Sequence, residues 1–128
     1  MKNKLLIGLL FASVSSFAMA QWDKVASTKE YNLYVTNIHK LSNTVKMWAL
    51  IDYKTGGDMS NHKYLSDRTL IEFDCNGEKF RILNYEMYDE HMGKGQTIYR
   101  DYSTSNWGNV EPDSIAETEW RIACGVKE

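Results

Sequence analysis

Two cysteines, Cys75 and Cys124, constrain the fold of this 128-residue chain more than any other feature of its sequence. They could form a disulfide, bind a metal or include a catalytic thiol. The compartment decides among these roles, because disulfides persist mainly in oxidising surroundings. The N-terminus, which carries targeting signals, therefore bears directly on the fold.

The N-terminus has the pattern of a signal peptide. Residues 1–4 are short and basic, residues 5–17 are apolar but too short to span a bilayer, and residues 18–20 (Ala-Met-Ala) match a small-residue cleavage motif. We predict a signal peptide at residues 1–20, cleaved before Gln21, and a periplasmic or secreted protein. The residue directly after the cleavage site is not a cysteine, and no second apolar run has membrane length, so we expect neither a lipid anchor nor a transmembrane anchor.

In an exported chain the two cysteines are most simply a disulfide, Cys75–Cys124. Closing a loop of about 50 residues removes entropy from the unfolded chain and stabilises a small domain by roughly 4 kcal/mol. A reactive thiolate at Cys75 is disfavoured by its acidic neighbours Asp74 and Glu78. We therefore predict a single disulfide-bonded domain at residues 21–128.

The charge of the chain argues against nucleic acid as a partner. Without Lys2 and Lys4 the formal charge falls from −2 to −4, whereas nucleic-acid binders normally carry a strongly basic surface. His39, His62 and His91 lie far apart and lack the spacing of metal ligands, so we predict no metal and no cofactor.

No arrangement of residues indicates catalysis. Acidic residues cluster at residues 85–91 and 111–119, and we interpret both clusters as solvated rather than as the buried acids of a glycosidase. No nucleophile has a base at a recognisable spacing. We therefore predict that the protein is not an enzyme.

Residues 31–102 alternate as in an antiparallel sheet. Residues 31–38, 64–75, 78–92 and 96–102 are predicted strands, and residues 45–53, apolar on both faces, are a predicted central strand. Within residues 31–38, one face carries Tyr31, Leu33 and Val35. Within residues 64–75, one face carries Thr69, Ile71, Phe73 and Cys75, and the other carries Arg68, Glu72 and Asp74. The alternation of apolar residues changes phase near Ile82 and Leu83, which predicts a β-bulge there. We predict a polar loop at residues 54–63 and a type I′ hairpin at Asn76-Gly77.

The C-terminal residues predict a helix. Ser114 and Glu117 form a capping box, and Gly125 is a typical residue after a helix end. Ala116, Trp120, Ala123 and Cys124 lie on one stripe of that helix. The predicted fold is therefore α+β: a mostly antiparallel sheet with one C-terminal α-helix tied to it by the disulfide, on the face that Cys75 shares with Ile71 and Phe73.

A small basic patch is the main candidate for binding. Lys63, Arg68, Lys79 and Arg81 flank the predicted hairpin, and we expect them to lie near one another. In an acidic protein such a patch could bind an acidic partner. Alternatively, the acids Glu72, Asp74 and Glu78 balance these basic residues, and the patch is an ordinary charged face of the sheet.

The order of these signals resembles the surface-adhesin protein E family. The resemblance is carried by "VKMWALIDY", by "YLS" followed nine residues after Ser66 by Cys75, by "EKFRILNYEMY" and "GKGQTIY", and by "PDSIAE" before the final cysteine. It implies an antiparallel sheet with a C-terminal helix. It also implies a surface adhesin that binds host extracellular-matrix and plasma proteins, such as vitronectin and laminin, and can form homodimers.

Family binding is associated with the basic strand that runs to the first cysteine. The matching positions are Lys63, Tyr64, Arg68, Lys79 and Arg81. This strand is less basic here than the family pattern, because it contains Asp67, Glu72 and Asp74.

Three functions follow as hypotheses. The first is a non-catalytic exported binding protein of the adhesin type, with host or envelope proteins as partners. The alternative is a periplasmic inhibitor of the lysozyme-inhibitor type or an envelope-stress protein. An enzyme acting on envelope polymers is the third, and it would require buried acids in a cleft.

Overall fold

The computed structural model describes residues 21–127, so the predicted signal peptide at residues 1–20 lies outside the described residues. Its elements, in chain order, are β1 (Asp23–Ser27), β2 (Tyr31–Lys40), β3 (Thr44–Met59), β4 (His62–Asp74), β5 (Lys79–Tyr88), the 3-10 turn η1 (His91–Gly93), β6 (Thr97–Asp101), β7 (Gly108–Asn109) and α1 (Ile115–Cys124). The strands form one sheet in the order β1-β2-β3-β4-β5-β6, and β7 pairs with β5. Every pair is antiparallel.

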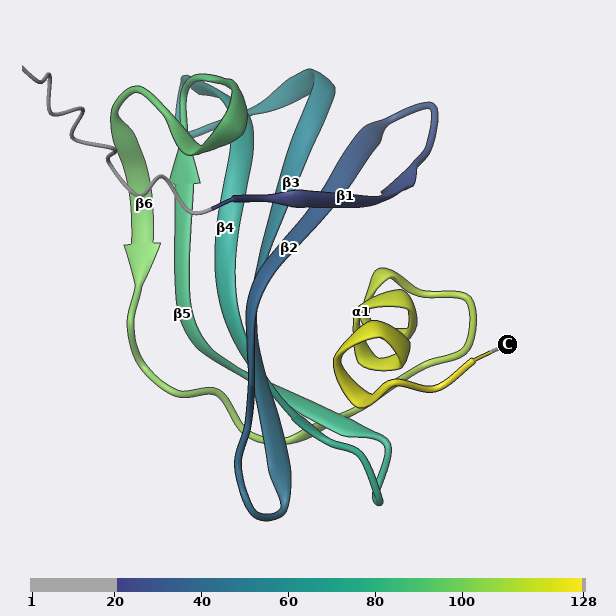
Figure 1. Ribbon diagram of the computed structural model, residues 1–128. Coiled ribbons are helices and arrows are strands. Elements are labelled where there is room, and N and C mark those ends of the chain that lie inside the picture. Colours follow the sequence, from purple (N-terminus) through teal and green to yellow (C-terminus); the bar gives the residue numbers. More distant parts are fainter. Residues whose placement is uncertain (1–20, 128) are drawn as a thin grey trace, which may run out of the picture.

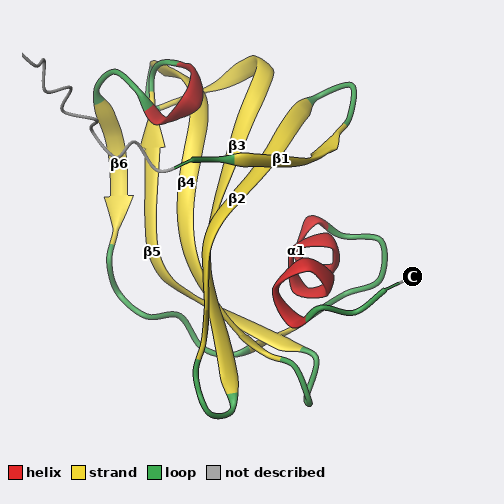
Figure 2. Ribbon diagram, viewed as in Figure 1, coloured by secondary structure: helices red, strands yellow, loops and turns green. Residues whose placement is uncertain are grey.

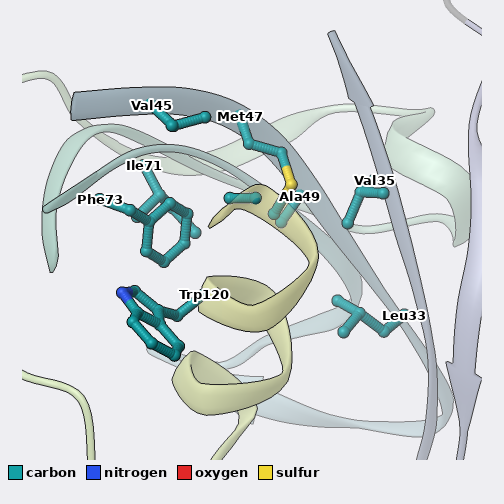
Figure 3. Packing of buried hydrophobic residues seen from close by; sticks show 9 residues of the cluster. Leu33, Val35, Val45, Met47, Ala49, Ile71, Phe73 and Trp120 are labelled. Atoms are coloured by element: carbon teal, nitrogen blue, oxygen red, sulfur yellow. The ribbon is translucent and has the colours of Figure 1, made fainter. Parts of the chain in front are cut away.

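The helix α1 covers one side of this strongly curved sheet (Figures 1 and 2). Trp120 and Ala123 of α1 are buried against side chains of the central strands (Figure 3), which include Val45, Met47, Ile71 and Phe73. The disulfide Cys75–Cys124 joins the end of α1 to the residue after β4. The predicted α+β fold, the disulfide and the face on which the helix lies are therefore confirmed.

Local signals set the ends of α1 as predicted. The backbone N–H of Glu117 donates to the side chain of Ser114 at 3.1 Å, and the Glu117 carboxylate accepts from the backbone N–H of Asp113 at 2.9 Å. Gly125 follows the last turn in the left-handed conformation, with φ 69°. The described residues contain no helix with the length and hydropathy that spanning a bilayer requires.

The two predicted connections of β4 were wrong. Residues 54–63 are not a loop, because β3 continues through a bulge and turns at Ser60 and Asn61, which both have positive φ. The turn after β4 is not a type I′ hairpin, because only Glu78 of its residues has positive φ. Here the Asp74 carboxylate accepts from the backbone N–H groups of the two residues of the Asn-Gly pair, which favours a longer turn.

The bulge between β4 and β5 is confirmed, since the register shifts so that Leu70 faces Asn84 and Ile71 faces Ile82.

One strand was not predicted. β1 is short and mostly polar, so it lacks the apolar alternation that identifies a strand, and only its pairing with β2 orders it.

The interpretation of both acidic clusters as solvated was also wrong, because one of them contains a buried acid. Asp67, Glu72 and Glu119 retain only 3%, 7% and 6% of their accessible surface. Glu119 belongs to one of the two acidic clusters of the sequence, and α1 buries it at the edge of the predicted apolar stripe. A buried carboxylate requires a partner or a proton.

Candidate protein-binding face

The side of the sheet opposite α1 carries two rows of alternating charge. In the first row Arg68, Glu86 and Arg100 lie directly opposite one another across β4 to β6. In the second row Lys46, Glu72 and Arg81 do so across β3 to β5. Trp48, Leu70 and Asn84 lie between the rows. We call this surface the outer face. Opposite charges on directly facing residues stabilise each other across strands.

The first row centres on Glu86. The Arg68 guanidinium binds the Glu86 carboxylate at 2.6 Å, and the hydroxyls of Tyr88 and Tyr102 donate to the same carboxylate. Partial burial opposes ionisation of Glu86, but hydrogen bonds from Tyr102, Tyr88 and Arg68 outweigh it and lower its pKa to about 2. The guanidinium of Arg68 also lies 4.9 Å from the centre of the Trp48 ring.

The second row centres on Glu72. Arg81 Nε donates to Glu72 Oε1 at 2.8 Å, and the Thr44 hydroxyl donates to Glu72 Oε2 at 2.7 Å. Burial favours the neutral acid, yet these hydrogen bonds and the charges of Arg81 and Lys46 lower the pKa of Glu72. The Arg81 guanidinium lies 4.4 Å from the centre of the Trp107 ring.

The two rows of the outer face are net basic, because they contain Lys46, Arg68, Arg81 and Arg100 but only two acids, Glu72 and Glu86. Beyond the rows, the same side of the sheet also carries Lys79, Asp74 and Asp52. The opposite side of the same strands carries the acids Asp67 and Asp101. The aromatic residues on the outer face remain accessible in part, with 38% of Trp107 and 52% of Tyr102 exposed. Exposed arginine and aromatic side chains on a net basic surface suit an acidic protein partner.

Hollows in the surface lie elsewhere. One of about 430 Å³ lies between β1 and α1, with Val25, Ile122 and Val126 in its lining. Another, of about 210 Å³, lies at the disulfide between Cys75 and Cys124. No arginine of the outer face lines either one. These two hollows are therefore separate from the outer face.

Comparison with known proteins identifies the family. The family model described as "Surface-adhesin protein E" matches residues 22–125. The chain belongs to the surface-adhesin protein E family. No curated protein matches the chain in sequence.

Solved structures of Haemophilus influenzae protein E have the same fold as this family member. Crystal form II matches with a TM-score of 0.59 and 17% identity over 80% of this chain and 96% of that chain. Protein E from non-typeable H. influenzae matches with a TM-score of 0.56 and 17% identity over 82% of this chain and 84% of that chain. At this identity the likeness concerns the fold.

Only some of the five positions implied by the surface-adhesin protein E resemblance lie together. Arg68, Lys79 and Arg81 share the outer face, where the Lys79 ammonium donates to Asn109 Oδ1 at 2.7 Å. Lys63 pairs with Asp58 near the opposite end of β4, so the expectation that it lies near Lys79 was wrong. The ring of Tyr64 packs edge-on against Tyr53, with their centres 5.4 Å apart.

Sequence reasoning missed most of the outer face of this adhesin-family domain. Its unpredicted members are Trp48, Glu86, Tyr88, Arg100, Tyr102 and Trp107. They come from three strands and from the loop between β6 and β7, and only strand register brings them together. Alternation within β4 could identify Arg68 and Glu72 as neighbours on one face, but it could not identify their partners on β3 or β5.

Proposed function

We propose that this member of the surface-adhesin protein E family is an exported, non-catalytic binding protein whose outer face recognises acidic surfaces of other proteins. Host matrix and plasma proteins are the partners that the family implies. The predicted signal peptide supports export to the periplasm or beyond. The observation that carries the proposal is the pair of charged rows, with their arginines stacked on aromatic rings.

The chemistry of this face fits protein recognition. Tryptophan, tyrosine and arginine dominate the binding energy of protein interfaces. The ion pairs Arg68–Glu86 and Arg81–Glu72 hold the two arginines in place before a partner arrives, which lowers the entropy lost on binding. Each guanidinium has further N–H groups that could bind a partner carboxylate.

The test replaces both arginines and compares them with an arginine elsewhere. In the double variant Arg68→Gln and Arg81→Gln, we expect binding to immobilised vitronectin or laminin to weaken about tenfold or more, because each arginine is a candidate hot spot. Arg121→Gln is the matched control, since Arg121 also pairs with a glutamate but lies on α1. Far-UV circular dichroism and thermal unfolding would establish that the variants remain folded.

Two results would count against this function. Unchanged binding by the folded double variant would remove the outer face from consideration, and equal loss in Arg121→Gln would make the effect nonspecific. Lysozyme inhibition, measured on the same preparation, tests the alternative of a periplasmic inhibitor.

A further inference from the structure

The Cys75–Cys124 disulfide borders an open hollow in the surface. The hollow measures about 210 Å³, and both cysteines line it together with residues 40–45 and Asn76. Each cysteine is only half-buried, although each also packs against the core beneath α1. The disulfide is therefore not sealed inside the core, and a group that enters the hollow meets it directly.

Two turns at one end of the sheet form the walls of this hollow (Figure 1). Residues 40–45 include the turn between β2 and β3, and Asn76 belongs to the turn between β4 and β5. Thr44 pairs with Asp74, which places the first turn beside Cys75. In that turn Leu41 is 41% exposed. The hollow therefore has an accessible apolar side chain at its edge.

The charges around the hollow suit an anionic visitor. Among the residues that the structure describes, its lining contains one cation, Lys40, and no acid. Asp74 precedes Cys75 in sequence but does not line the hollow, and its carboxylate accepts from the backbone N–H groups of Asn76 and Gly77. The nucleophile that exchanges with a disulfide is a thiolate, which is an anion. Lys40 would attract it.

The packing of α1 does not depend on the disulfide alone. Trp120 and Ala123 are buried against the strands, with 8% and 2% of their surface exposed. The Trp120 indole N–H also donates to the backbone carbonyl of Asp74 at 3.2 Å. Cleavage of the bond between the sulfurs therefore leaves the helix in place, and exchange does not require the protein to unfold.

We propose that this hollow is a thiol–disulfide exchange site, at which the folded protein reacts with a dithiol. One thiolate of the dithiol bonds to one sulfur of the disulfide, and the other sulfur leaves with the electron pair of the broken bond. The second thiolate of the dithiol then displaces the protein from the mixed disulfide. Cys75 and Cys124 end as thiols that carry the two protons of the dithiol, which itself becomes a disulfide. The reverse steps form the Cys75–Cys124 bond.

The kinetics of reduction by dithiothreitol test this proposal on the chain of residues 21–128, without denaturant. Mass spectrometry after alkylation counts the free thiols. We expect the rate to be proportional to the dithiothreitol concentration and to change less than twofold in 1 M urea, because the folded protein reacts. If the reaction required unfolding, 1 M urea would raise the rate about fivefold or more, or the rate would not depend on dithiothreitol. Either result would overturn the proposal.

A charge reversal tests whether the thiolate enters by this hollow. Lys40→Glu should slow the reduction about threefold or more at low ionic strength, because it repels the thiolate. Lys29→Glu is the matched control, since Lys29 is also exposed but precedes the other end of β2, and it should react like the wild type. Equal rates in the two variants would refute entry by this hollow.

A trapping experiment distinguishes a protein partner from a small thiol. A thioredoxin-type protein whose second active-site cysteine is replaced by serine cannot complete the second step. It should therefore remain attached to Cys75 or Cys124 as a mixed disulfide, detected by non-reducing electrophoresis. This adduct would assign the site to dithiol proteins, whereas reaction with dithiothreitol alone would assign it to small thiols. The proposal is independent of the binding function, because no arginine of the outer face lines the hollow.

Discussion

At the scale of single residues, prediction from neighbouring residues fails where a residue type is required by a contact with a distant part of the chain. Gly56 illustrates this. It has φ +80°, and a Cβ atom built there would lie 2.3 Å from the carbonyl oxygen of Tyr64. The Gly-Gly pair therefore marks a close approach of β3 to β4 rather than the loop that its composition predicted.

Substitution of Gly56 tests that interpretation. We expect Gly56→Ala to cost about 3 kcal/mol in urea unfolding, because an unfavourable φ and a backbone clash act together. Gly125→Ala is the control: it has φ +69° but open space around it, so it should lose only about 1 kcal/mol. Equal losses at the two positions would mean that the close approach contributes nothing.

At the scale of elements, α1 is both the best predicted part of the fold and the part with the least expected surroundings. Its capping box, its C-terminal glycine and its apolar stripe are contained in a short stretch of sequence, so propensity and spacing suffice to predict them. The burial of Glu119 depends on the strands that lie beneath it. No signal within the helix marks Glu119 as a buried residue.

The disulfide should contribute more to stability than any single contact of α1. For the double variant Cys75→Ser and Cys124→Ser, we expect the free energy of unfolding to fall by about 4 kcal/mol, because the closed loop no longer restricts the unfolded chain. Urea unfolding measures this loss. Reductant should destabilise the wild type to a similar degree and leave the variant unchanged; a loss below about 1 kcal/mol would contradict the entropic account.

At the scale of the whole molecule, the two sides of the sheet respond to pH in opposite ways. On the outer face the pKa of Glu86 is lowered to about 2, so its contribution to stability is present above its unfolded pKa and is lost as pH falls. Beneath α1 the pKa values of Asp67 and Glu119 are raised to about 6 and about 8. Their contribution is present in acid and is lost as pH rises through these values.

We therefore expect an unusual stability profile. The free energy of unfolding should increase from pH 2 to about pH 4.5, as Glu86 ionises in the unfolded chain, and then decrease towards pH 8 by about 2–4 kcal/mol. Urea unfolding at a series of pH values measures the curve. A maximum of stability at pH 7 or above would contradict the raised pKa values of the buried acids. In Glu119→Gln the decrease in the free energy of unfolding towards pH 8 should be smaller than in the wild type.

The sequence alone determined what depends on neighbouring residues or on covalent chemistry. The ends of α1, the inward faces of Leu33 and Phe73, the bulge between β4 and β5 and the disulfide could all be predicted from it, because alternation, capping and the cysteine pair are local or compositional signals. Tertiary structure decided the rest. The charged rows of the outer face and the burial of Asp67 and Glu119 exist only once register and helix packing bring distant residues together, and no local pattern encodes that packing.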